Sequence, residues 1–325
     1  MAAAPTETLQ AEHAALRTGC GVIDRSERGR LALTGPGAIE FLNGQVTNEL
    51  AGLRPGEGRY AAFLTHKGKM LGDLRILAVA EAGGDATELL LDTERPALQG
   101  LFDMIRRFKV GYDLELHKRT LQTGELSLIG PRAAELAGAE LPAEEHANAP
   151  VELDGIAALA VRTYIGVDLI CSASDTAGLL EVLQGRGALP VGPAAAECLR
   201  VEHGRPRYGI DLDDSVIPQE AGLNERAVSF TKGCYVGQET VARLFYKGKP
   251  NRHLRGLRLA GPADPGAELR LGERVVGQLT SVADSPDLGP IALALLRREA
   301  EPGASLQVGE SGLQGIVLEL PFAGA

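Results

Sequence analysis

One segment of the chain places a reactive thiol beside a residue that could tune it. Residues 232–239 have the sequence Lys-Gly-Cys-Tyr-Val-Gly-Gln-Glu, in which two glycines flank Cys234 and permit tight turns close to a bound group. Lys232 stands two residues before this thiol, where a positive charge would favour the thiolate. The same pattern also fits a buried cysteine in an ordinary loop-to-helix turn, which is the commoner fate of a free cysteine.

Two acidic residues are candidates for recognising a heterocycle or moving a proton. Glu202 lies in the segment 200–211, where we expect a helix to end and a loop to follow. A carboxylate beside such a loop suits paired N–H donors, although a salt-bridged helix end explains it equally well. Asp73 lies in segment 68–75, in an otherwise apolar strand, so it could be buried and functional. An outward-facing acid is the alternative, and the alternation of the strand does not decide between them.

A duplicated unit is the first element that could position these residues. Residues 31–41, Leu-Ala-Leu-Thr-Gly-Pro-Gly-Ala-Ile-Glu-Phe, recur as residues 126–136, Leu-Ser-Leu-Ile-Gly-Pro-Arg-Ala-Ala-Glu-Leu. Both copies predict a short strand that ends at Gly-Pro and is followed by a helix. Two copies indicate a duplicated α/β module, because a solenoid needs at least three repeats. Between the copies, residues 60–79 have the pattern of a β-hairpin with a polar turn.

The C-terminal part of the chain has a different pattern of apolar and turn-forming residues. Short apolar segments alternate there with Gly, Pro and Asp turns, a spacing typical of a small antiparallel barrel or sandwich. We therefore expect two intertwined, duplicated α/β domains over residues 1–245 and a β-barrel over residues 246–325. The predicted strands are residues 254–259, 268–271, 274–282, 291–297, 305–308 and 313–320.

Composition narrows the functional classes. The chain has 325 residues, 44% of them hydrophobic, and a net charge of −10, which argues against general affinity for nucleic acid. The segment 240–263 is the exception, since it has six basic residues and no acid, and could attract a polyanion or simply be a solvated surface. No apolar run approaches the ~20 residues of a membrane span, and there is no secretory signal, so we expect a cytoplasmic protein.

Four widely spaced cysteines predict free thiols rather than disulfides in that compartment. They also predict no compact zinc site, because no two Cys or His residues have the short spacing that such sites use.

Three segments together resemble the YgfZ-type folate-binding proteins, relatives of the glycine-cleavage T-protein (aminomethyltransferase). The octapeptide 232–239 is similar to the hallmark of that family. Residues 41–48, Phe-Leu-Asn-Gly-Gln-Val-Thr-Asn, resemble its first helix. Residues 200–209, Arg-Val-Glu-His-Gly-Arg-Pro-Arg-Tyr-Gly, resemble an element shared with the T-protein. The resemblance extends from about residue 21 to about residue 320.

The resemblance implies an α+β fold, a three-lobed cloverleaf of two related α/β domains plus a small antiparallel β-barrel. Tetrahydrofolate, or a one-carbon derivative of it, would occupy the central opening. Cys234 would be the functional thiol, with Lys232 and Asp73 also among the reacting groups, and Glu202 would contact the pterin. The other residues expected to bind folate are Tyr208, Arg75, Asn43, Tyr235, Gln238 and Glu239.

By the same resemblance, the protein would support the assembly or repair of iron–sulfur enzymes, including tRNA-modifying ones. Its partners would be folate and iron–sulfur proteins or their assembly machinery, with no membrane and no direct binding of nucleic acid. The alternatives are a true aminomethyltransferase and an RNA-binding module that uses residues 243–258. The T-protein has a Gly-Gly-Ile-x-Asp-Asp element, whereas residues 68–73 here are Gly-Lys-Met-Leu-Gly-Asp. The loss of one acid and the presence of the cysteine octapeptide both favour the iron–sulfur branch.

Overall fold

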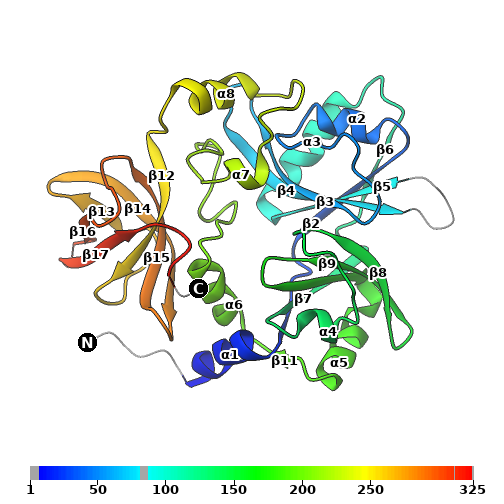
Figure 1. Ribbon diagram of the computed structural model, residues 1–325, viewed down its shortest axis with the longest axis horizontal. Coiled ribbons are helices and arrows are strands. Elements are labelled where there is room, and N and C mark those ends of the chain that lie inside the picture. Colours follow the sequence, from blue (N-terminus) through cyan, green and yellow to red (C-terminus); the bar gives the residue numbers. More distant parts are fainter. Residues whose placement is uncertain (1–6, 81–86, 311, 324–325) are drawn as a thin grey trace.

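The three largest hydrophobic cores of the described residues belong to three lobes, which are arranged as a cloverleaf (Figure 1). The computed structural model describes residues 7–80, 87–310 and 312–323. Two lobes are α/β, and the third is a closed six-stranded barrel formed by the C-terminal part of the chain. The predicted fold class is therefore confirmed.

The first lobe is a five-stranded sheet with helices α2 (Ala38–Asn43) and α3 (Leu98–Phe108) packed into its core. The α3 residues Leu101 and Ile105, four positions apart, are fully buried, as expected for the inner face of an amphipathic helix. The strands, in sheet order, are β3 (Gly58–Leu64), β4 (Met70–Ala80), β5 (Thr87–Thr93), β2 (Gly29–Thr34) and β6 (Glu115–Lys118).

The second lobe is a six-stranded sheet that packs against α4 (Ala133–Leu136) and α5 (Thr176–Gly185). Its strand β1 precedes the whole first lobe in the sequence, so the two α/β lobes are interleaved along the chain. The strands, in sheet order, are β11 (Leu189–Pro190), β1 (Gly21–Asp24), β7 (Thr123–Ile129), β10 (Gly166–Ser172), β9 (Ile156–Arg162) and β8 (Asn148–Leu153).

The sequence repeat appears as one strand–turn–helix unit in each α/β lobe, β2–α2 in the first and β7–α4 in the second. Each strand ends at a glycine with positive φ, Gly35 at 99° and Gly130 at 125°. A Cβ at Gly35 would lie 2.7 Å from the Asp113 carbonyl oxygen, and one at Gly130 would lie 2.6 Å from that of Gly19. Glycine recurs at this position because both the backbone conformation and the close approach require it.

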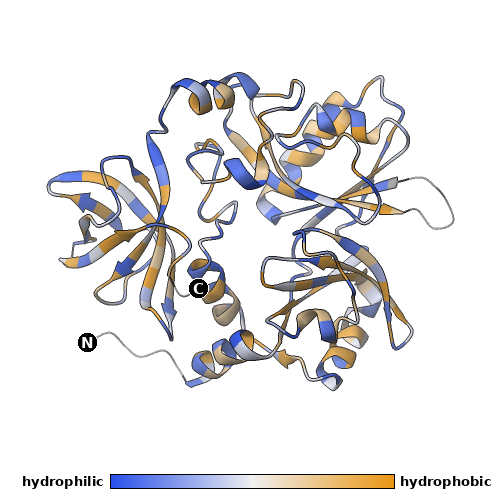
Figure 2. Cartoon of the chain, in the orientation of Figure 1, coloured by the Kyte–Doolittle hydropathy of each residue, from blue (hydrophilic) through white to orange (hydrophobic). Residues whose placement is uncertain are grey.

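The third lobe closes into a barrel through antiparallel pairing of its first and last strands, β12 and β17. Hydrophobic and polar residues alternate along its strands (Figure 2), so that one face fills the barrel core. The strands are β12 (Arg252–Leu259), β13 (Glu268–Leu271), β14 (Arg274–Ser285), β15 (Gly289–Arg297), β16 (Ser305–Val308) and β17 (Leu313–Leu318). The expected domain boundary after residue 245 falls within helix α8 (Gln238–Lys247), which leads into β12.

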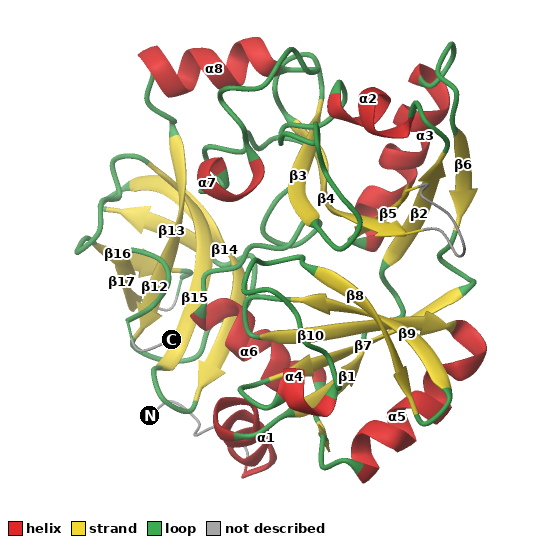
Figure 3. Cartoon of the chain, turned by 45° about the vertical axis from the view of Figure 1, so that its right-hand side comes forward, coloured by secondary structure: helices red, strands yellow, loops and turns green. Residues whose placement is uncertain are grey.

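Helix α6 (Pro193–Glu202) lies between the lobes and packs against α1 (Glu7–Thr18), β14 and β15 (Figure 3). Its buried residues contact both the second lobe and the barrel, so α6 fixes how these lobes sit around the centre. Two further short elements are the 3-10 turns Arg95–Ala97 and Ala173–Asp175, and α7 (Asn224–Ala227) packs near β3. In the described ranges, no helix is long and apolar enough to cross a membrane.

Candidate functional site

A cavity of about 190 Å³ lies where the two α/β lobes meet α6. Its lining is unusually rich in charged side chains, with more arginines than acids. The arginines are Arg25, Arg28, Arg75, Arg200, Arg205, Arg207 and Arg226, and the acids are Asp73, Glu94, Glu125, Glu145 and Asp168. A wall of this composition can hold a ligand that combines carboxylates with N–H donors, because each group meets a partner of opposite polarity.

Asp73 and Tyr60 form the part of the wall best suited to move a proton. They come from the adjacent strands β4 and β3, and the Tyr60 hydroxyl donates a hydrogen bond to Asp73 Oδ2 at 2.7 Å. Burial raises the pKa of Asp73 to about 6, although the hydrogen bond from Tyr60 acts in the opposite direction. A carboxyl group with a pKa near neutrality can both accept and return a proton under physiological conditions.

Arg75 joins the two α/β lobes through a buried ion network. Its Nε donates to Asp92 Oδ2 at 2.7 Å within the first lobe, and its other nitrogens contact Asp168 and Glu125 of the second lobe. Burial raises the pKa of Glu125 to about 7. Burial alone would also raise the pKa of Asp92, but Arg28 and Arg75 hold that pKa below its usual range. The network therefore contains both a firmly ionised acid and one that titrates near neutrality.

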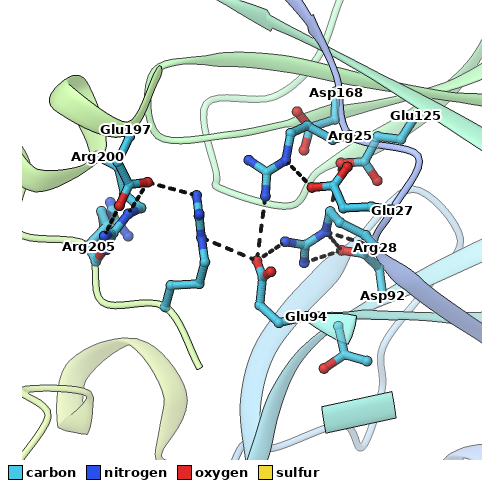
Figure 4. Close-up of polar contacts among 12 residues, drawn as sticks. Arg25, Glu27, Arg28, Asp92, Glu94, Glu125, Asp168, Glu197, Arg200 and Arg205 are labelled. Atoms are coloured by element: carbon cyan, nitrogen blue, oxygen red, sulfur yellow. Dashed lines mark hydrogen bonds and ion pairs between the residues drawn. The ribbon is translucent and has the colours of Figure 1, made fainter. Parts of the chain in front are cut away.

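A second set of contacts extends this network across the cavity (Figure 4). Glu94 accepts contacts from Arg25, 3.7 Å away, and from Arg28, and it lies 3.9 Å from Arg207. Arg207 in turn contacts Glu197 on α6 at 3.2 Å. The arginines of the first lobe are thus connected to α6 through alternating charges.

Three further wall residues escaped the sequence interpretation. Tyr164 precedes β10, and the Arg205 guanidinium lies 4.3 Å from the centre of its ring. Asp168 lies in β10 and is 6% exposed. His146 has a positive φ of 74° and a buried Nδ1 without a partner, and burial lowers its pKa to about 3. Asp168 carries the signal that singled out Asp73, an acid in an otherwise apolar strand, whereas no local signal marks Tyr164 or His146.

The structure brings only some of the expected site residues to this cavity. Asp73 and Arg75 line it. Glu202 does not: its carboxylate is enclosed between α1, α6 and β14, where Oε1 accepts hydrogen bonds from His13 at 2.9 Å and Ser285 at 2.5 Å. Tyr208 is partly buried and packs against the core of the first lobe, so it also lies outside the cavity lining.

Lys232 has a different setting from the one its sequence position suggested. Its ammonium donates hydrogen bonds to three backbone carbonyls in the turn after α2, those of Asn43 at 2.6 Å, Val46 at 2.9 Å and Asn48 at 2.7 Å. The Asn43 side chain is used locally too, since its Oδ1 accepts from the Leu50 N–H at 2.8 Å. Burial lowers the pKa of Lys232 to about 8. Lys232 and Asn43 therefore hold two loops together, and no contact links Lys232 to the thiol.

The octapeptide 232–239 forms a separate surface feature. Cys234 is exposed, whereas Tyr235 is buried in a small core with Met70 of the hairpin. Gly237 has a φ of 85° and begins α8, whose first residues are Gln238 and the exposed Glu239. A Cβ at Gly237 would lie 2.5 Å from the Thr65 carbonyl oxygen, so the octapeptide packs tightly on the β3–β4 turn. All eight residues are described, and none of them lines the central cavity.

Comparisons with known proteins place this geometry in context. The family model described as the GCVT N-terminal domain matches residues 3–232. The aminomethyltransferase of Streptomyces coelicolor is 32% identical, over 90% of this chain and 82% of that protein. The aminomethyltransferase of Geobacillus kaustophilus is 31% identical, over 97% of this chain and 90% of that protein. A putative chloroplastic transferase of Arabidopsis thaliana is 29% identical, over 95% of this chain and 72% of that protein.

Among solved structures, the glycine cleavage system aminomethyltransferase T from Bartonella henselae superposes with a TM-score of 0.85. Its sequence is 25% identical, and the match covers 97% of this chain and 89% of that one.

Proposed function

Because this chain belongs to the glycine-cleavage T-protein (aminomethyltransferase) family, we propose that it binds a tetrahydrofolate in the central cavity and transfers a one-carbon unit there. The observation that carries the proposal is Asp73, a buried wall carboxyl that Tyr60 orients and whose pKa is about 6. Proteins named aminomethyltransferase are similar to this chain over most of its length, which supports transfer as the activity.

The residues of the cavity fit a reduced folate. Asp168 offers a carboxylate to the paired N–H groups of the pterin, and the Tyr164 ring offers an apolar face. The excess of arginines suits the carboxylates of the glutamate tail. A volume of about 190 Å³ is below the ~300–1,000 Å³ of pockets that enclose a drug-sized ligand. The cavity would therefore enclose the ring system, with the tail extending outward.

A bound tetrahydrofolate supplies the ring nitrogen that accepts the one-carbon unit. The chain itself supplies the proton carrier and its orientation. Among the described residues, Tyr60 is the single hydrogen-bond donor to the Asp73 carboxylate. The other carboxylate oxygen, Oδ1, can therefore accept the proton of the ring nitrogen to which the one-carbon unit is transferred. Buried surroundings strengthen this interaction, since less water competes for the carboxylate.

Equilibrium binding and a transfer assay test the two parts of the proposal separately. We expect wild-type protein to bind tetrahydrofolate, Tyr164→Ala to bind it more weakly, and Cys234→Ala to bind it normally, because Cys234 lies outside the cavity. Asp73→Asn should retain binding but lose about 100-fold or more of the transfer of a one-carbon unit from an aminomethyl-lipoyl carrier. A wild-type protein that does not bind tetrahydrofolate would refute the proposal.

One observation favours a second candidate, a folate-binding accessory factor for iron–sulfur enzymes of the YgfZ type. Cys234 is exposed on a loop held by Lys232 and Gly237, as a thiol that serves a partner protein should be. In a strain lacking its own factor, Cys234→Ala should then fail to restore the activity of an iron–sulfur enzyme. Full rescue by Cys234→Ala would remove this candidate. No transfer with active partner proteins, together with normal folate binding, would select it over the transferase.

A further inference from the structure

A buried cluster of metal-ligating side chains lies away from the central cavity, where α6 packs against both α1 and β14. His13 comes from α1, Cys198 and Glu202 from α6, and Ser285 from the end of β14. Each of the four is at most 2% exposed. His13, Cys198 and Glu202 each place a potential ligand atom within 4.8 Å of the other two. None of the four lines the central cavity, so the proposed folate site does not account for this cluster.

The hydrogen bonds of this cluster are distributed unevenly. Glu202 Oε1 takes part in all three contacts, with His13 Nε2 at 2.9 Å, Cys198 Sγ at 3.3 Å and Ser285 Oγ at 2.5 Å. Glu202 Oε2 is equally buried but has no partner. Leaving a buried polar atom unpaired is costly, and a buried carboxylate also needs positive charge nearby. The ion pairs of the described chain give Glu202 one partner, His13.

We propose that His13, Cys198 and Glu202 bind one zinc ion, which connects α1, α6 and the barrel. An imidazole nitrogen, a thiolate and a carboxylate form a ligand set that binds Zn²⁺ in preference to harder cations. Bonds of ~2.0–2.3 Å in a tetrahedral site place neighbouring ligand atoms roughly 3.3–3.7 Å apart. The observed separations, all within 4.8 Å, need only small side-chain rotations to reach that arrangement. The Ser285 hydroxyl is available as the fourth ligand or as a hydrogen-bond donor to the carboxylate.

Zinc binding would correct both deficiencies of the cluster. The ion places a positive charge beside the buried carboxylate, and Oε2 can take part once the carboxylate rotates towards the metal. The Cys198 thiol loses its proton to solvent on binding, and neutral His13 binds through Nε2. Because His13 and Glu202 are 189 positions apart in the sequence, a search for short ligand spacings does not find this site. Its position between three elements indicates a structural role.

The first test uses the full-length wild-type protein, stripped of metal under reducing conditions and titrated with Co²⁺ as a spectroscopic probe. We expect one equivalent to bind with tetrahedral d–d bands and a thiolate-to-cobalt charge-transfer band, and Zn²⁺ to remove both. Zn²⁺ should also raise the melting temperature of the stripped protein. No charge-transfer band, together with a melting temperature that does not respond to Zn²⁺, would overturn the proposal whatever the variants do.

Variants then identify the thiol. Cys198→Ala should lose the charge-transfer band and weaken Co²⁺ binding by more than ~100-fold, since even outer partners of a metal site are worth ~10–100-fold. Cys171→Ala, a buried thiol in β10, and Cys234→Ala, the exposed thiol, are the matched controls and should bind normally. If Cys198→Ala does not fold, His13→Gln should show the same loss of Co²⁺ affinity. Normal binding by a folded Cys198→Ala, or loss of the band in Cys234→Ala, would contradict the assignment.

Discussion

Replacing Asp73 by Asn should stabilise the protein at neutral pH while removing one-carbon transfer. Burial raises the pKa of this carboxyl from 3.8 to about 6, so the ionised form is disfavoured in the native state. At about 1.4 kcal/mol per pH unit, this difference corresponds to about 3 kcal/mol of lost stability above pH 6. Asn has a similar shape and no charge, and its side-chain oxygen can accept the Tyr60 hydrogen bond. The variant should recover up to this amount.

The sign of the effect follows from which state holds the proton. Between pH 3.8 and about 6, Asp73 is ionised in the unfolded chain and still protonated in the native protein. The stabilising contribution of the protonated carboxyl is therefore complete below pH 3.8 and is lost as the pH rises through about 6. The advantage of Asp73→Asn should grow over this window and stay constant above it.

Urea unfolding at pH 5, 6, 7 and 8 measures this advantage directly. The control is Asp214→Asn, which removes one negative charge from an exposed position outside the cavity. We expect the free energy of unfolding of Asp73→Asn to exceed that of wild type at pH 8, and by less at pH 5. An equal advantage at pH 5 and pH 8, or a less stable variant at pH 8, would refute the reasoning. The transfer assay on the same samples shows whether stability is gained at the cost of activity.

Three further substitutions test the structural roles assigned above. Burial lowers the pKa of His146 to about 3, so the unfolded chain takes up a proton near pH 6.5 that the native state rejects. His146→Asn, which tolerates the positive φ, should reduce the loss of stability between pH 7 and pH 5; an unchanged loss would contradict this. Lys232→Met should lower the free energy of unfolding by about 2 kcal/mol, because three carbonyls lose their donor; an unchanged urea midpoint would show otherwise. Gly237→Ala should lower the free energy of unfolding by about 1–3 kcal/mol, because Gly237 has a left-handed backbone and a Cβ there would meet Thr65. Gly233→Ala, with open space around it, should lower the free energy of unfolding by less. Equal losses in the two variants would count against the packing argument.

Local patterns predicted much of the fold because they determine its elements directly. The repeated Leu-x-Leu-x-Gly-Pro units correspond to β2–α2 and β7–α4. The short segments between the regular turns after residue 252 correspond to the barrel strands. Which strands pair is not a local property. Strand β1 pairs with β7, about a hundred residues later, on one side and with β11 on the other. No alternation in a four-residue strand specifies either partner, so only the family resemblance suggested interleaved lobes.

The candidate site was predicted only where one residue carried its own signal. Asp73 is conspicuous as an acid within an apolar strand, and the cavity wall contains it. Arg75, by contrast, owes its setting to Glu125 and Asp168, which are 50 and 93 positions away. Lys232 shows how proximity in sequence can mislead. It stands two residues from Cys234, yet its ammonium reaches carbonyls 184 to 189 positions away, because a long side chain follows the packing of its loop.

The β3–β4 hairpin is the physical connection between the cavity and the octapeptide. Its middle carries Asp73 and Arg75 on the cavity wall, and its turn supports Gly237. Cys234 itself is exposed and lies outside the cavity lining. A thiol in that position cannot attack a carbon atom held beside Asp73 unless the loop leaves its packing against the hairpin. Exposure of Cys234 therefore favours chemistry with a partner at the surface over chemistry inside the cavity.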